Sequence, residues 1–409
     1  MALSQSDKLL LYCLSAVQDE TGDRRLNGLS SSDWDVLFED SRRHGIASLL
    51  YYRLRTFHPR TPIPANVMER LRQIYLQCSC RNMQLYHELG NLMGTLRLDN
   101  IPVIALKGVH LATVVYRNVA LRPMGDIDLL VKQSDLLRVQ EILVKQGYIA
   151  LKEEVGCAQE HLPPYKKKGS FTIEIHFHIV GPPFSLRVDV EKLWARAQMS
   201  SIQGIKVLTL CPEDLVPHLC MHASFHHGFD NGIRPLLDIS HTIQHYAKEF
   251  DWEQLLNRSK EWGVGKCVYL SLFLAKKFAG APIPEQIMKD LDVYDDSFAA
   301  ATLAEELIFT KSTSVAPNIA MLFDNKNLLD RLIHFIRCAF PPKNTMADMH
   351  LLSRNPLSVY SLYSFRIKGL LKRHGHTAWR LLLRDREVST YAKFENKRSA
   401  LKDWLTRRT

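Results

Sequence analysis

Residues 1–95 place apolar side chains at helical spacing and contain few strand-like runs. The stretch from Ala65 to Arg97 keeps this spacing throughout and predicts one long helix. Before it, Ser32-Asp33 can cap a shorter helix that runs through Trp34. We therefore predict a helical N-terminal region over residues 1–95.

The pattern changes between Ile101 and Leu210, where short β-branched runs alternate with helix-like segments. A first strand is predicted from Val103 to Leu106, and Gly147 ends a predicted helix from Ser134 to Gln146. This alternation predicts an α/β or α+β region over residues 96–210.

A helical pattern resumes at Pro212, a residue that fits the first turn of a helix. It continues to about Phe278, and the segment from Gly280 to Pro284 then breaks it. We assign residues 211–310 to a second helical region and residues 311–409 to a basic, mostly helical C-terminal region.

Length and composition are those of an ordinary multidomain globular protein, since 409 residues with 46% hydrophobic content can form two or three packed cores. The apolar run from Leu9 to Leu14 is too short to span a bilayer, so we expect no transmembrane segment and a cytoplasmic location. The eight cysteines contain no Cys-x-x-Cys pair, and Cys78 and Cys80 lack a second pair for zinc. Reduced thiols are the expected state.

Asp126 and Asp128 are separated by one apolar residue at the start of a strand-like run that ends at Val131. Strand side chains alternate, so both carboxylates should project from one face while Ile127 and Leu129 point into a core. Such a pair can hold a divalent metal ion, which favours phosphoryl-transfer chemistry. The alternative is an ordinary exposed turn, where Asp-apolar-Asp tripeptides also occur.

A phosphate-binding turn is predicted beside this pair, because Lys107-Gly108 follows the first strand and Arg122 precedes the two aspartates. Gly108 would let a triphosphate approach the backbone N–H groups of the next helix. Lys107 would contribute a point charge and Arg122 a bidentate fork. The alternative is that both are exposed surface charges.

These motifs resemble the uncharacterised bacterial nucleotidyltransferase family of the DNA-polymerase-β superfamily. The resemblance covers roughly residues 40–290, and its motifs keep their order along the chain. Further matching segments are Gly147-Tyr148, Glu174-Ile175-His176, Leu210 to Leu215, Leu219 to His222, Arg234 to Ile239, and Asp251-Trp252.

The resemblance implies a polymerase-β-like nucleotidyltransferase domain with a mixed sheet, flanked by helical N- and C-terminal regions. It implies Mg²⁺-dependent transfer of a nucleoside monophosphate from an NTP, with ATP as the expected donor and pyrophosphate as the leaving group. The acceptor would be a hydroxyl or similar group on a peptide, protein or small molecule. Two Mg²⁺ ions, or Mn²⁺ in their place, would lie about 3.5–4 Å apart.

The superfamily usually completes its metal site with a third carboxylate on a neighbouring strand, and Glu174 is the best candidate. Alternation places Glu174 on one strand face with Thr172, His176 and His178. Glu174 would bind the second metal or act as general base, whereas the two histidines are either functional or surface residues. The alternatives are a solvated role for Glu174 and its replacement by Glu153, Glu154 or Asp189.

One position departs from the superfamily pattern. Most members have Ser or a second Gly after the motif glycine, whereas this chain has Val109 after Gly108. The hydroxyl contact to phosphate is then missing, and Lys107 and Arg122 would have to compensate. The departure supports an alternative function, a noncatalytic nucleotide-binding or interaction module of the same fold.

His218, His222 and His226 recur every four residues and would form one stripe on a helix. We disfavour a zinc site there, because the Glu that follows the first His of a His-Glu-x-x-His protease is absent. We expect this helix to cover the nucleotide cleft, with His222 near the nucleotide and His218 or His226 satisfied in polar contacts. Arg234 and Asp238 also lie four apart, either as an intrahelical ion pair or as a bridge to the catalytic domain.

The C-terminal segment carries most of the net charge. Residues 361–409 contain thirteen Lys or Arg and four Asp or Glu, a net +9 beside +10 for the whole chain. Interleaved aromatic residues such as Trp379 and Trp404 favour foldable helices over a plain disordered arm. The interpretations are a solvated basic face, or binding of an acidic protein, an anionic membrane surface or RNA, the last of which would make the enzyme RNA-directed.

Overall fold

The computed structural model describes residues 3–15, 25–26, 28–56, 63–151, 160–310 and 386–407. The N-terminal helices are α1 (Gln5–Leu14), α3 (Ser31–Arg43), α4 (Ala47–Thr56) and α5 (Ala65–Leu98). The predicted long helix is therefore confirmed as α5. The cap of α3 lies at Ser30 rather than Ser32-Asp33, because Ser30 Oγ accepts from Asp33 N while Asp33 Oδ2 accepts from Ser30 N.

A mixed seven-stranded sheet follows, with the strand order β3-β4-β5-β2-β1-β7-β6. β2 pairs in parallel with β5, β1 pairs in parallel with β7, and the other neighbours are antiparallel. The strands are β1 (Ile104–Ala105), β2 (Asp126–Leu130), β3 (Ile149–Ala150), β4 (Tyr165–Lys166), β5 (Thr172–His176), β6 (Gln198–Ile202) and β7 (Ile205–Thr209). The predicted mixed sheet between helical segments is confirmed.

Short helices connect the strands. After β1 come α6 (Lys107–His110) and a π-helical turn η1 (Leu111–Val115), and after β2 come a 3₁₀ turn η2 (Gln133–Asp135) and α7 (Leu136–Lys145). A second 3₁₀ turn η3 (Phe184–Leu186) and α8 (Val190–Arg196) lead from β5 to β6. The helix expected from Ser134 to Gln146 corresponds to α7, and Gly147 follows it at φ +85°.

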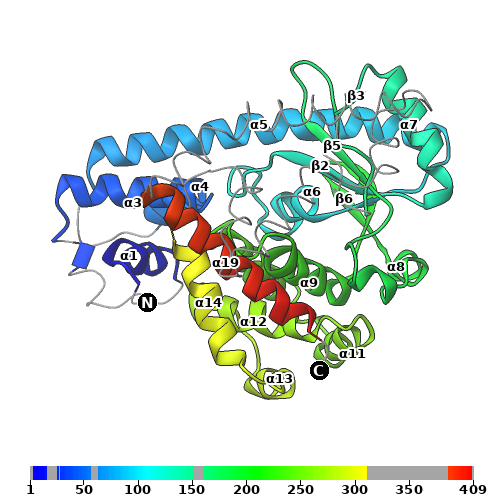
Figure 1. Ribbon diagram of the computed structural model, residues 1–409. Helices are drawn as coiled ribbons and strands as arrows, with labels where there is room; N and C mark the ends of the chain where they lie inside the picture. The colour runs from blue at the N-terminus through cyan, green and yellow to red at the C-terminus, as the bar shows by residue number, and fades with distance from the viewer. Residues whose placement is uncertain are drawn as a thin grey trace, which may run out of the picture. The chain divides into compact units, whose positions relative to one another are not determined.

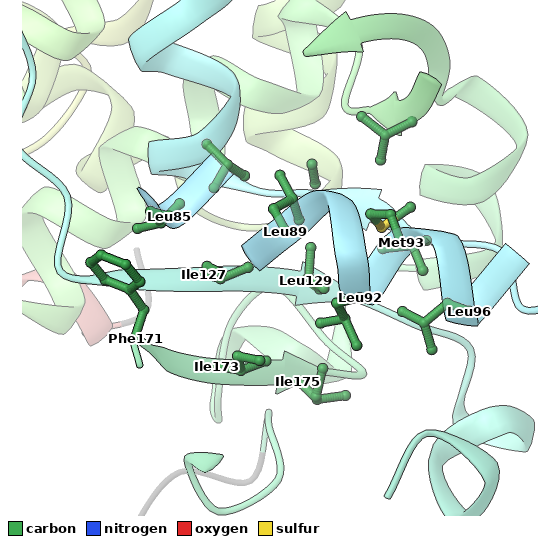
Figure 2. Packing of buried hydrophobic residues seen from close by; sticks show 14 of the residues in the cluster. Leu85, Leu89, Leu92, Met93, Leu96, Ile127, Leu129, Phe171, Ile173 and Ile175 are labelled. Carbon is green, nitrogen blue, oxygen red and sulfur yellow. The ribbon is translucent and has the colours of Figure 1, made fainter. Parts of the chain in front are cut away.

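The main core lies between α5 and one face of the sheet (Figures 1 and 2). Leu85, Leu89 and Leu92 of α5 recur at helical spacing and face strands β2 and β5. The strands meet this stripe with Ile127 and Leu129, both fully buried, and with Ile173 and Ile175. Alternation along the strands leaves the opposite face of β2 and β5 for polar side chains.

A second helical group packs together after the sheet: α9 (Pro212–Met221), a π-helical turn η4 (His222–His226), α10 (Arg234–His245), α11 (Trp252–Glu261), α12 (Gly265–Ala279), α13 (Glu285–Leu291) and α14 (Ser297–Phe309). The start of α9 is fixed by a fully buried carboxylate, Asp214. Its two oxygens accept hydrogen bonds from Arg196 of α8 and Arg258 of α11.

The chain divides into two compact units, residues 1–309 with 405–409, and residues 310–404. Most of the basic C-terminal region lies outside the described residues, and the structure describes only α19 (Arg386–Thr406) within it. Phe394 and Leu401 of α19 are buried, which is what the folded interpretation of this segment expects. Within the described ranges, no helix combines the length and apolarity needed to cross a bilayer.

We predict that the α5 stripe carries much of the stability of this core. Leu92 is fully buried and Leu98 is 84% exposed on the same helix, so they form a matched pair. Leu92→Ala should lower the free energy of unfolding by about 2–5 kcal/mol because it leaves a cavity against the sheet. Leu98→Ala should change it by about 0.5 kcal/mol or less. Urea unfolding of both variants measures the difference, and equal losses would contradict this packing.

Candidate functional site

The polar face of β2 and β5 gathers the predicted acidic residues. The parallel register pairs Asp126 with Thr172 and Asp128 with Glu174. Because Ile127 and Leu129 point into the α5 core, Asp126 and Asp128 project from the opposite face, together with Glu174 and His176. The predicted alternation on both strands is confirmed.

Asp128 lies at the centre of this group and is only 5% exposed. Its Oδ1 is 3.0 Å from His176 Nε2 and 3.5 Å from Lys107 Nζ, and the same His176 nitrogen is 3.7 Å from Glu174 Oε2. Ligand atoms of Asp128, Glu174 and His176 all lie within 4.8 Å of one another, and no other described group of acids, histidines and cysteines does so. Asp126 is not part of this trio.

Electrostatics separates the two aspartates. Burial raises the pKa of Asp126, and the charges of Asp128 and Glu174 raise it further, to about 6. Burial also acts to raise the pKa of Asp128, but Lys107 and the hydrogen bond from His176 outweigh it and hold that pKa well below its ordinary value. Burial lowers the pKa of His176, but the hydrogen bonds to Asp128 and Glu174 outweigh burial. The pKa of His176 is therefore raised above its ordinary value. The carboxylates on this face therefore carry more negative charge than Lys107 and His176 neutralise.

This donor set fits a divalent metal ion. Carboxylate oxygens are the ligands that Mg²⁺ and Mn²⁺ prefer, and an imidazole nitrogen is an acceptable further ligand for Mn²⁺. The charges of Asp128 and Glu174 repel that of Asp126 and so raise its pKa. A bound cation would relieve this repulsion. Asp128 and Glu174 offer carboxylate oxygens suited to a metal, and His176 contacts both of them. Asp126, the other predicted ligand, lies on the same strand face but is not part of this group.

The predicted phosphate-binding residues also come together. Lys107 begins α6 in the left-handed region, at φ +39°, a conformation uncommon for a residue with a side chain. A Cβ on Gly108 would lie 3.0 Å from Arg122 Nη1 and 3.3 Å from Met124 Sδ, so this position has little room for a side chain. Gly108 therefore lies against one edge of the Arg122 guanidinium.

The other edge of the Arg122 guanidinium forms an ion pair with Asp238. Arg122 Nε and Nη2 donate to the two carboxylate oxygens of Asp238, each at 2.9 Å, and the Tyr116 hydroxyl donates to Asp238 Oδ1 at 2.9 Å. Of the two interpretations of Asp238, the structure therefore shows the bridge from α10 to the sheet region. The bridge holds Arg122 in place and leaves Nη1 toward Gly108.

The histidine stripe is broken by the π-helical turn that begins at His222. His222 Nε2 lies 3.2 Å from His227 Nε2, and the described residues contain no metal-binding group along the stripe. His218 is buried and neither ring nitrogen has a hydrogen-bond partner. Burial lowers its pKa well below the ordinary value, and the nearby charge of Lys107 lowers it further, so a neutral imidazole faces the charged cluster.

The remaining candidates lie elsewhere. Asp189 caps α8, where its Oδ1 accepts hydrogen bonds from Glu191 N and Lys192 N, and Glu153 and Glu154 lie outside the described residues. His178 follows β5 and is held by the backbone, with Nε2 3.2 Å from the carbonyl of Val188. Among the competitors that the structure describes, Glu174 alone joins the Asp128 cluster.

Two histidines, His176 and His218, have surroundings that the sequence does not reveal. His176 was placed on the correct face, but nothing in the sequence distinguished a surface histidine from one buried against Asp128. Of the two histidines expected to make polar contacts, His226 lies 3.6 Å from Glu160 Oε1 through its Nδ1, whereas the ring nitrogens of His218 are buried without a hydrogen-bond partner. The useful signal was the spacing of two residues between Glu174 and His176, which puts both side chains on the face that carries the acids.

A family model described as uncharacterised nucleotidyltransferase matches residues 30–280, a range that includes every candidate residue of the site. No curated protein and no solved structure gives a significant match to the chain.

We predict that Asp126 destabilises the metal-free protein at neutral pH. Because its folded-state pKa of about 6 exceeds the ordinary 3.8, the folded state is favoured while this group is protonated and loses stability as the pH rises through 6. Asp126→Asn should therefore raise the free energy of unfolding at pH 7.5 by on the order of 1–3 kcal/mol. The gain should shrink toward pH 5. Urea titrations with EDTA at both pH values measure it, and a less stable variant at pH 7.5 would contradict the charge balance.

Proposed function

We propose that this chain, which belongs to the uncharacterised nucleotidyltransferase family, transfers a nucleoside monophosphate from an NTP to an acceptor hydroxyl. The observation that carries the proposal is the in-register pair Asp128 and Glu174, with Asp126 beside them, on the polar face of the sheet. ATP is the proposed donor. A hydroxyl or similar group on a peptide, protein or small molecule is the proposed acceptor.

Asp126, Asp128 and Glu174 would hold Mg²⁺, or Mn²⁺ in its place. When bound, the metal would neutralise charge on the reacting phosphate and on the departing pyrophosphate. Lys107 is the counter-ion of Asp128 in the metal-free protein, at 3.5 Å. Once another cation neutralises that carboxylate, the Lys107 ammonium becomes available to the nucleotide phosphates.

The transfer itself requires in-line attack. The acceptor oxygen forms a bond to the α-phosphorus, the bond between that phosphorus and the bridging oxygen to the β-phosphate breaks, and pyrophosphate leaves. The acceptor proton passes to a base. Glu174 has two alternative proposed roles, ligand of the second metal or this base, and its side chain is more exposed than that of Asp128. Arg122, held by Asp238, would orient the triphosphate over Gly108.

The alternative within the same fold is a nucleotide-binding module without turnover. Val109 is the sequence feature that supports it, and its side chain belongs to the buried core beneath α6. The backbone carbonyl of Val109 accepts a hydrogen bond from Tyr86, which fixes this segment. A phosphate contact from a side chain at this position is thereby absent, so Lys107 and Arg122 carry the cationic role in our proposal.

Two further proposals concern the compartment and the acceptor. Six described cysteines are unpaired thiols, Cys78 and Cys80 among them, which agrees with a reducing compartment such as the cytoplasm. An RNA acceptor would depend on the basic segment, which lies mostly outside the described residues.

We predict that the acidic cluster is required for catalysis. Asp126→Asn, Asp128→Asn and Glu174→Gln should each lower Mg²⁺-dependent transfer by about 100-fold or more, because each removes a metal-ligand charge. Asp189→Asn is the matched control, since asparagine can still cap α8. Release of pyrophosphate from ATP with a panel of hydroxyl acceptors is the readout. Full activity in the Asp128→Asn variant would rule out this site.

We predict distinct effects from two residues of the phosphate turn. Gly108→Val should weaken ATP binding at every ionic strength, because its side chain would collide with Arg122. Lys107→Ala should weaken it about 10- to 100-fold at low salt and less at high salt, as expected for one charged contact. Calorimetry with ATP at two salt concentrations measures both.

Gly94→Val provides the control for the glycine substitution. Gly94 also lies in a helix, and a Cβ added there meets nothing within 4 Å. Its ATP affinity should match that of the wild type. Unaltered ATP binding by Gly108→Val would remove the turn from the nucleotide site.

A further inference from the structure

A second arginine, Arg234, lies near the site. Its guanidinium has no ion-pair partner among the described residues. Arg234 begins α10 and is largely withdrawn from solvent, and its Nε is buried without a hydrogen-bond partner. Within the described residues, the side chain makes no hydrogen bond and no ion pair. An arginine presents five N–H donors and stays protonated in proteins, so this position is costly unless a partner is supplied.

The nearby acid cannot supply that partner. Asp238 lies one helical turn after Arg234, but both its oxygens accept from Arg122 and one also accepts from Tyr116. Burial lowers the pKa of Arg234 and the positive charge of Arg122 lowers it further, although Asp238 and Asp126 act in the opposite direction. Two guanidinium groups thus lie near a single carboxylate that pairs with only one of them, and a second anion would balance the charge of Arg234.

Neighbouring backbone restricts the position of the Arg234 side chain. Gly45, at φ +65°, lies directly against the guanidinium, because a Cβ there would come within 3.2 Å of Arg234 Nη1. The adjoining His44 is fully buried, and its Nδ1 accepts a hydrogen bond from Ile233 N at 3.3 Å. Gly232, at φ +68°, leaves room for that imidazole. The turn after α3 and the turn before α10 therefore fix Arg234 from both sides.

We propose that Arg234 binds the β- and γ-phosphates of the NTP and the pyrophosphate that leaves, an inference that rests on the proposed nucleotidyl transfer. Three observations carry it: the unused donors of Arg234, the saturated carboxylate of Asp238, and the proximity of Arg122, whose Nη1 faces Gly108. Arg234 lies one turn before Asp238 on α10, and Asp238 binds the Arg122 guanidinium. Arg234 therefore lies near Arg122, the residue that we propose orients the triphosphate.

The inference also assigns a role to the N-terminal helices. The turn that holds Arg234 follows α3, and the matched family region begins at residue 30, at the cap of α3. The helical region before the sheet would thus complete the phosphate site by positioning an arginine that belongs to α10.

Calorimetry with sodium pyrophosphate and with Mg-ATP tests the assignment on the full chain. Arg234→Gln should lower the affinity for pyrophosphate about 10- to 100-fold, the loss expected for one charge-assisted contact, and Arg234→Lys should lose less because it keeps the charge. Arg72→Gln is the matched control: this exposed arginine of α5 pairs with Glu69 of the same helix and should bind both ligands as the wild type does.

Thermal unfolding separates a lost ligand contact from a lost fold. Because Arg234→Gln removes an unpartnered buried cation, its melting temperature without ligand should equal or exceed that of the wild type. Higher stability together with unchanged pyrophosphate affinity would overturn the inference, even if the wild type transfers nucleotides. Reduced pyrophosphate affinity in a stable Arg234→Gln variant would support it, and transfer by the wild type, assayed separately, decides the proposed reaction.

Discussion

The parallel pairing of β2 with β5 is the constraint on which the site depends. One register sends Ile127 and Leu129, with their partners on β5, into the leucine stripe of α5, as Figure 2 shows. The same register sends Asp128 and Glu174 to the opposite face, side by side. A shift of one residue would bury the acids under α5, so hydrophobic burial fixes where the carboxylates stand.

Concentrating acids on one face has a cost that the surrounding residues offset in part. Lys107 and His176 stabilise Asp128 as the anion, whereas Asp126 keeps a raised pKa because its neighbours repel its charge. A similar imbalance of opposite sign occurs at Arg122 and Arg234, because the carboxylate of Asp238 pairs with Arg122 and leaves Arg234 without an ion-pair partner. Under the proposed function, an excess of acid beside an excess of cation would suit a metal ion and a polyphosphate, at a cost in stability.

Local sequence rules predicted much of this arrangement. Periodicity identified α5 almost to its ends, and alternation placed Asp126 and Asp128 on one face of their strand and Glu174 on one face of its own strand. The parallel register that puts the two faces side by side comes from the structure. The sequence could not show that Asp238 reaches Arg122 rather than Arg234, because that bridge joins residues 116 positions apart. For the same reason, neither the burial of His176 against Asp128 nor the contact of Arg234 with Gly45 was predictable. These features follow from tertiary packing, which period and spacing do not encode.

The central claim is that the polar face of β2 and β5 binds a metal ion and the triphosphate together. The most direct measurement is the anomalous scattering of Mn²⁺ in crystals grown with a non-hydrolysable ATP analogue. The account predicts a manganese peak in contact with the carboxylates of Asp128 and Glu174, with the triphosphate beside Lys107 and Gly108. A nucleotide bound elsewhere, or a manganese ion that contacts neither carboxylate, would contradict it.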